Sequence, residues 1–223
     1  MPVRQPPVVA PDVTRLATSG TGRLEETDPL DLGPREDYEL LHVADGDISR
    51  DLSGISLTDC RLERLTAHGA VLTGARLMDT MLVAVTAPSL AASRMSLQDV
   101  VIRDSRLGAA EMFDGVVRGL IVEGCRIDFL NLRGSTLTDV LFRDCHIGDL
   151  DLGGARSDRV AFEGCRADAV DMSGARNRNV DLRGLEIGGL RSVDGLAGTT
   201  MSAMQTALLA TVFASHLGIR VEE

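Results

Sequence analysis

The stretch FRDCHIGDLDLGGARSDRVAFEGC, residues 142–165, holds the residue types that could bind a metal ion. It contains Cys145, His146 and Cys165, with Asp149 and Asp151 between them. Thiolate, imidazole and carboxylate groups are the usual protein ligands of zinc. Whether these side chains could meet around one ion depends on the elements that carry them.

The rest of the chain offers no recognisable catalytic arrangement. It has no Gly-rich phosphate loop leading from a strand into a helix, no nucleophile elbow, no HExxH and no CxxC. The histidines are scattered, at positions 42, 68, 146 and 216. We therefore expect a protein that is not an enzyme and binds no cofactor.

Composition restricts the protein class further. The 223 residues carry a net charge of −10, are 44% hydrophobic and only 3% aromatic, and include four cysteines. No apolar run is long enough to span a membrane, and the first residues lack the apolar stretch of a secretory signal. We expect a soluble cytoplasmic protein with free thiols, whose acidity disfavours direct nucleic-acid binding and favours a basic partner.

A five-residue period organises most of the chain. Counting in fives from Leu52 to Ile187 gives 28 positions, of which 22 hold Leu, Ile, Val, Met or Phe. The 27 positions two residues earlier, from Ile55 to Leu185, hold mainly apolar or small residues, and neither set contains a charge. Chance would place about 14 charged residues among these 55 positions, so both columns are predicted to face inward.

A period of twenty residues lies on top of the first. Residues 110–189 align without a gap in four rows of twenty, so four pentads form one coil and the same side recurs every twenty residues. Gly or Asp often ends a pentad, where a turn tolerates a left-handed backbone. We predict turns at positions 54, 59, 74, 79, 134, 139, 154 and 174.

The twenty-residue period changes the interpretation of the cysteines. Cys125, Cys145 and Cys165 occupy one inward column, where strands are about 4.8 Å apart and a disulfide needs a Cβ separation of about 3.8 Å. His146 takes an outward position beside two arginines, Arg126 and Arg166, of the neighbouring coils. We therefore expect free buried thiols and no metal site.

The pentads VDLRG, VDMSG, LDLGG, LNLRG and GDISR resemble the motif of the pentapeptide-repeat family, over roughly residues 41–193. The resemblance implies an all-β solenoid, a right-handed quadrilateral β-helix, of about seven coils from Asp51 onward. We assign the β-helix to residues 38–195. The spacing from Val43 to Ile48 is five but from Ile48 to Leu52 is four, which indicates a small deletion in the first coil.

The two ends of the chain lack the period. Residues 1–37, with six prolines, are predicted to be a mostly disordered tail, in which the acidic stretch EETDPLD is a flexible arm or a plain linker. Residues 196–223 are predicted to form a C-terminal helix and a short tail, with Thr200 or Ser202 as N-cap and Gly218 as the stop.

That helix is more apolar than a cap over the last coil requires. Its apolar residues recur at helical spacing, and the resemblance to the Qnr and MfpA members of the family implies a homodimer through this end. Two roles of the helix are possible, as a cap over the last coil or as a dimer interface. The interface residues would be Met201, Met204, Leu208, Leu209, Val212, Phe213 and Leu217.

An acidic column on the outside is the remaining candidate for a partner site. It comprises Glu111, Asn131, Asp151 and Asp171. One explanation is that Asp or Asn before the central Leu is the repeat's own consensus. The other follows from the resemblance to Qnr and MfpA, which implies mimicry of DNA phosphates, binding to DNA gyrase and fluoroquinolone or toxin tolerance. A general protein-interaction scaffold with another partner is the alternative, favoured if arginines interrupt the negative band.

Overall fold

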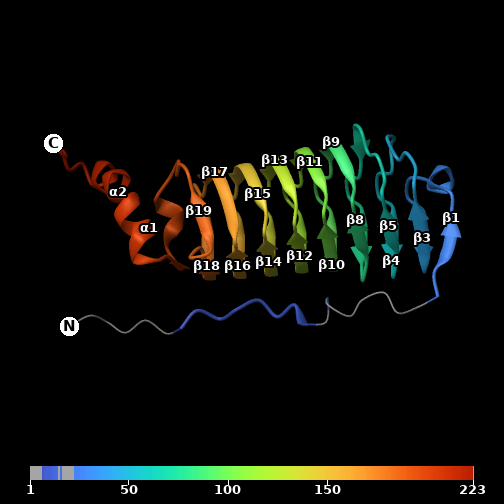
Figure 1. Cartoon of the computed structure of the whole chain (residues 1–223), viewed down its shortest axis with the longest axis horizontal. Coiled ribbons are helices and arrows are strands. Elements are labelled where there is room, and N and C mark those ends of the chain that lie inside the picture. The colour runs from blue at the N-terminus through green and yellow to red at the C-terminus, as the bar shows by residue number, and fades with distance from the viewer. Residues whose placement is uncertain (1–6, 15, 17–22, 223) are drawn as a thin grey trace.

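A computed structural model of the chain describes residues 7–14, 16 and 23–222. Parallel strands wind into one solenoid of about nine turns, with two short helices at its C-terminal end (Figure 1). The predicted fold class is confirmed, with more coils than the seven counted from Asp51. Within the described residues, no helix has the length and apolarity needed to cross a membrane.

Two parallel sheets form the wall of the solenoid. One has 13 strands: β1 (Glu25–Thr27), β2 (Asp37–Glu39), β3 (Leu41–Ala44), β4 (Ser56–Thr58), β5 (Arg61–Glu63), β7 (Arg76–Met78), β8 (Met81–Val83), β10 (Ser96–Arg103), β12 (Val116–Glu123), β14 (Thr136–Arg143), β16 (Arg156–Glu163), β18 (Arg176–Asp181) and β20 (Thr199–Thr200). The other has seven: β6 (Ala70–Val71), β9 (Thr86–Ala91), β11 (Arg106–Glu111), β13 (Arg126–Asn131), β15 (His146–Asp151), β17 (Cys165–Asp171) and β19 (Leu185–Ile187).

Strand register confirms the twenty-residue coil. Leu137 pairs with Ser157, and Ile127 pairs with Ile147, each twenty positions along. Where β2 pairs with β4 and β3 with β5 the offset is 19, as between Val43 and Leu62. This change of offset confirms the single-residue deletion near Ile48.

The two inward columns form one continuous apolar core. Leu137, Ile147 and Leu152 are at most 4% exposed, and Cys145 is 3% exposed. The rings of Phe142 and Phe162 stack on successive coils with centroids 5.0 Å apart. Side chains of one column therefore pack on their equivalents in the next coil, which is why each column keeps its residue size along the sequence.

Left-handed residues turn the chain at the corners. All eight predicted turn positions have positive φ, for example Gly54 at 70° and Asp139 at 56°. Glycine has no Cβ to clash in this conformation, and Asp tolerates it better than most residues do. The Gly or Asp at the end of many pentads therefore favours the turn into the next side, and residues such as Arg64 and Ala84 adopt the same conformation at other corners.

The prediction of a mostly disordered tail over residues 1–37 is wrong for residues 25–32. β1 pairs with β3 at Glu25 and Leu41, and the short 3-10 helix η2 (Pro29–Asp31) leads to Leu32, which is buried in the core. The stretch EETDPLD is thus part of a coil that precedes the one predicted to be first, because backbone pairing does not need the pentad period. Residues 7–14 and 16 lie along the outside of later coils (Figure 1). Residues 1–6, 15 and 17–22 lie outside the described part.

Ion pairs connect neighbouring coils on the outside of the solenoid. The guanidinium of Arg159 contacts both carboxyl oxygens of Asp139 at 2.6 and 2.7 Å, and Arg178 contacts Asp158 in the same way. These arginines lower the pKa of both carboxyl groups. Charged side chains therefore stabilise the stack in a pH-dependent manner.

We expect the free energy of unfolding to decrease at acid pH. A carboxyl group whose pKa is lower in the folded than in the unfolded state stabilises the fold at pH values above its pKa in the unfolded chain. This stabilisation is lost as the pH falls through the pKa of the group in the folded chain. The loss should begin below about pH 4. Asp79, whose pKa is raised by burial and then by Asp59 and Asp99, acts in the opposite sense.

Urea unfolding at pH 7 and pH 3 measures this dependence. The variant Asp139→Asn should lose less stability between these two pH values than the wild-type chain does. Equal losses in the two proteins would contradict the role assigned to Asp139.

Candidate protein-binding surfaces

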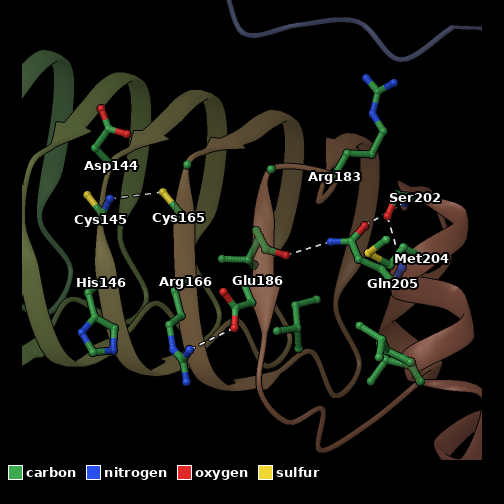
Figure 2. Close-up of a pocket in the computed structure, with 16 residues that line it drawn as sticks. Asp144, Cys145, His146, Cys165, Arg166, Arg183, Glu186, Ser202, Met204 and Gln205 are labelled. Carbon is green, nitrogen blue, oxygen red and sulfur yellow. Dashed lines mark hydrogen bonds and ion pairs between the residues drawn. The ribbon is translucent and has the colours of Figure 1, made fainter.

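Within residues 142–165, the coil holds the cysteines apart from His146. Cys145 and Cys165 are buried on successive coils, and the backbone N–H of Cys145 donates to Sγ of Cys165 at 3.5 Å (Figure 2). A hydrogen bond with Cys125 and burial raise the pKa of the Cys145 thiol to about 11. That shift disfavours the thiolate that a metal ion would need.

His146 lies on the outer surface, as predicted. Its ring contacts Arg126 at 3.4 Å and Asp168 at 3.3 Å, away from the thiols. Over residues 7–14, 16 and 23–222, no three His, Cys, Asp or Glu side chains are grouped so that they could hold a metal ion. Residues 142–165 thus contribute their cysteines to the core and His146 to ion pairs on the outer surface.

The structure stacks the four residues of the predicted acidic column. Glu111 pairs with Asn131, Asn131 with Asp151, and Asp151 with Asp171 on consecutive coils of the smaller sheet. The amide of Asn131 donates to Glu111 at 2.6 Å, so the first two members are joined directly.

Three members of the column have a local structural role. The side-chain oxygen of Asp151 accepts the backbone N–H of Gly153 at 2.8 Å, and Asp171 accepts that of Ser173 at 2.8 Å. Asn131 accepts the N–H of Arg133 at 3.1 Å. Each side chain thus satisfies a backbone donor two residues on, as Asp and Asn commonly do at turns. This explains why the repeat favours Asp or Asn at this position.

Arginines interrupt the negative band on this face. Nη1 of Arg133 lies 3.0 Å from a carboxyl oxygen of Asp151 and 3.7 Å from one of Asp171. Arg191 pairs with Asp149 beside them at 2.6 Å. The side chains of Asp151 and Asp171 are only 15% and 18% exposed. The column is therefore a mixed-charge surface rather than a free row of carboxylates.

A different acidic column is less interrupted. Asp59, Asp79 and Asp99 occupy one corner of three consecutive coils, and each has positive φ. In the described part of the chain, no arginine forms an ion pair with any of the three. Their twenty-residue spacing is visible in the sequence, where Asp59 and Asp79 were predicted only as turn residues.

The C-terminal segment forms two helices instead of the single helix predicted. Ser202 caps α1 (Ala203–Leu208), and its hydroxyl accepts the backbone N–H of Gln205. The chain bends at Leu209 before α2 (Ala210–His216), and Gly218, at a φ of 73°, follows the end. Ser202 as N-cap and Gly218 as stop are confirmed.

The seven predicted interface residues lie on two different faces. Leu209 is buried, and Met201, Val212 and Phe213 are half-buried. Met204, Leu208 and Leu217 point outward and are 75%, 78% and 71% exposed. The segment therefore combines apolar side chains that pack toward the last coil with others that this chain leaves exposed.

Gln205 closes the last coil, a role that the sequence did not reveal. Its side-chain amide donates to the backbone carbonyls of Leu182 and Leu185 at 2.6 and 2.8 Å. These carbonyls would otherwise pair with a further coil. An open cavity of about 760 Å³ lies beside this cap, with Met204 and Leu208 on its helical side and Arg166 and Glu186 on its coil side.

The chain is similar to known proteins only in comparisons of structure, and there the similarity is low. No protein-family model matches the sequence, and no curated protein sequence matches it. Among solved structures, full-length QnrB1, described as a plasmid-mediated fluoroquinolone resistance protein, is 19% identical with a TM-score of 0.30, covering 87% of this chain and 95% of its own.

A trypsin-treated QnrB1 variant is 17% identical with a TM-score of 0.29, covering 84% of this chain and 100% of its own. HetL, a pentapeptide repeat protein involved in heterocyst differentiation regulation from the cyanobacterium Nostoc, is 17% identical with a TM-score of 0.33, covering 76% of this chain and 92% of its own. At these values the likeness does not extend to function, and the fold rests on the strand pairing of the chain itself.

Proposed function

We propose that this chain, a pentapeptide-repeat protein by its five-residue period and twenty-residue coils, acts without catalysis as a protein-binding solenoid that pairs with a second copy. The observation that carries the proposal is the exposure of three large apolar side chains, Met204, Leu208 and Leu217, at the C-terminal end. Exposed apolar patches of this kind mark interaction sites on soluble proteins.

The charge of the segment supports pairing of two copies. Residues 201–218 contain no Asp, Glu, Lys or Arg, although a quarter of the whole chain is charged. Two copies of an uncharged apolar face can meet without burying an unpaired charge, and a twofold interface uses one surface patch on both subunits. The open cavity beside α1 offers further surface for such a contact.

Introducing charge at Met204 and Leu208, two outward apolar residues, tests the pairing. We expect the wild-type chain to have twice the monomer mass of 23.8 kDa by light scattering, and the double variant Met204→Glu, Leu208→Glu to have the monomer mass. Leu30→Glu is the matched control, because Leu30 is 72% exposed near the opposite end of the solenoid. A monomeric wild-type chain, or a double variant of unchanged dimer mass, would refute the pairing.

DNA gyrase is the candidate partner that the resemblance to Qnr and MfpA suggests. The net charge of −10 favours a partner with a basic groove, whereas the arginines beside Asp151 and Asp171 weaken the imitation of a row of phosphates. The outward charges repeat about 4.8 Å apart and DNA phosphates 3.4 Å apart, so recognition would depend on the averaged potential.

A supercoiling assay with purified gyrase, with and without a fluoroquinolone, decides between gyrase and another partner. If the acidic column binds gyrase, the wild-type chain alters supercoiling or protects it from the drug, and Arg133→Ala strengthens the effect because it removes the charge over Asp151. Absence of any effect at micromolar protein would exclude gyrase and leave the scaffold with another protein partner.

A further inference from the structure

One outward column of the solenoid is apolar. It consists of Met81, Val101, Ile121, Leu141 and Ala161, which pair in register on five consecutive coils. Outward positions elsewhere carry mainly polar and charged residues, and single apolar residues among them need no explanation. Five in a row make a continuous apolar strip along the wall.

The strip is nevertheless shielded from solvent. Val101, Ile121 and Leu141 are 2%, 7% and 4% exposed, and they form a second apolar cluster separate from the main core. Their cover comes from the other end of the sequence. Leu16 is 2% exposed in this cluster, and Val13 packs against it.

The covering segment, residues 7–14 and 16, runs lengthwise across the coils (Figure 1). We call this segment the strap. The backbone N–H of Asp12 donates to Oδ1 of Asp139 at 2.8 Å, and that of Val9 reaches Oδ1 of Asn179 at 3.4 Å, two coils further on. Asp139 is held in place by Arg159 from the adjacent coil. One aliphatic anchor and one carboxylate thus fix the strap at separate points.

Most of the strap makes little contact with the wall. Val9 is 52% exposed, and residues 10, 12 and 14 are exposed as well. No strand of either sheet includes these residues, so the attachment lacks a backbone ladder. Pro11 restricts the backbone to extended conformations, which reduces the entropy lost when the segment is laid along the coils. Few anchors and a stiff backbone are typical of a peptide ligand rather than of an integral strand.

We propose that the apolar strip and Asp139 form a docking groove for an extended peptide, and that the strap is its occupant within the same chain. The groove recognises an aliphatic side chain at the position of Leu16 and a backbone N–H at the position of Asp12. The strap therefore competes with any other extended segment for this surface. The groove includes no residue of the C-terminal helices, so its test is separate from that of pairing through Met204 and Leu208.

Peptide binding to the full-length chain tests the groove. The probe is a fluorescently labelled synthetic peptide with the sequence of residues 7–16, measured by fluorescence anisotropy. The full-length variant Leu16→Asp should release its own strap and bind the peptide at least tenfold more tightly than the wild-type chain. Val9→Asp is the matched control, because Val9 is exposed, and it should behave as wild type.

Two further variants locate the binding. A probe peptide that itself carries Leu16→Asp should not bind, and adding Ile121→Asp to the Leu16→Asp chain should abolish binding of the unchanged probe. Circular dichroism and thermal unfolding establish that each chain is folded. Equal affinity of wild type and Leu16→Asp for the probe, or binding that persists with Ile121→Asp, would overturn the proposal.

Hydrogen exchange on the wild-type chain gives a second, mutation-free measurement. Excess unlabelled peptide should accelerate exchange of the Asp12 amide and leave the amides of β14 unchanged. If the Asp12 amide exchanged as slowly as the amides of β14, with or without peptide, the strap would be an integral part of the fold. Unfolding of the Leu16→Asp variant would lead to the same conclusion, and either result would overturn the proposal.

Discussion

Leu132→Asp should abolish folding of the solenoid. Leu132 is 2% exposed and lies in the main core, where its column contacts equivalent residues of the coils on either side. An aspartate there would place an unpaired carboxylate in an apolar interior that no water reaches. The expected loss exceeds about 4 kcal/mol, which is comparable to the whole stability of many domains. Loss of the far-ultraviolet strand signal and of a cooperative thermal transition would show it.

Arg126→Ala is the matched control for this variant. Arg126 is in the adjoining β13 strand, but its side chain points outward and is 57% exposed. Removing it should change the free energy of unfolding by no more than about 0.5 kcal/mol. Similar thermal stability of the two variants would contradict the assignment of inward and outward positions.

Gly148→Ala should destabilise the chain although it adds only one methyl group. A Cβ at Gly148 would lie 2.3 Å from the backbone carbonyl oxygen of Asp128 in the preceding coil. That carbonyl belongs to the stacked backbone and cannot move aside without disturbing the ladder. Overpacking of this kind costs about 1–3 kcal/mol. The decrease in the free energy of unfolding would be measured as a lower midpoint in urea, with the dependence of that free energy on urea concentration unchanged.

Gly154→Asn tests whether the effect at Gly148 comes from this contact. Gly154 has a φ of 66°, but no atom lies within 4 Å of a Cβ placed there. Asp114 occupies the same corner column two coils earlier with a φ of 55°, so the backbone there accommodates a side chain of this size. We expect a change below about 1 kcal/mol. If Gly154→Asn destabilised more than Gly148→Ala, the steric explanation would fail.

The wall of the solenoid was predictable from the sequence because it is a local repeat. Each inward residue is followed by another five positions later, and the coil closes after twenty, so register, core and corners follow from counting. The one-residue deletion near Ile48 was visible for the same reason, and strand pairing confirms it. The separation of Cys145 from His146 likewise follows from the alternation of inward and outward positions.

The coil that contains β1 and η2 was missed because its residues do not repeat. β1 and η2 belong to the solenoid through backbone pairing with β3 and through burial of Leu32, and neither requires a pentad. Prolines and charges in that segment resemble the composition of a disordered tail. Composition reports average burial, whereas backbone hydrogen bonds form independently of side-chain type.

The acidic column shows that residues of neighbouring pentads decide whether a motif presents negative charge. Its spacing was evident, but whether it presents negative charge depends on where the long side chain of Arg133 lies. In the structure that guanidinium reaches Asp151 in the next coil and approaches Asp171 in the one after it. A side chain with several rotatable bonds can reach more than one partner, and the sequence does not specify which.

The sequence by itself determined the period, the inward columns and the turns, because these depend on side-chain polarity and backbone preference within five or twenty residues. The tertiary structure decided which remote segments meet. Only there does Gln205 cap the carbonyls of Leu182 and Leu185, and only there does Leu16 cover Ile121. Such contacts join segments with no common period, and they depend on the three-dimensional shape of the completed coil rather than on any local pattern.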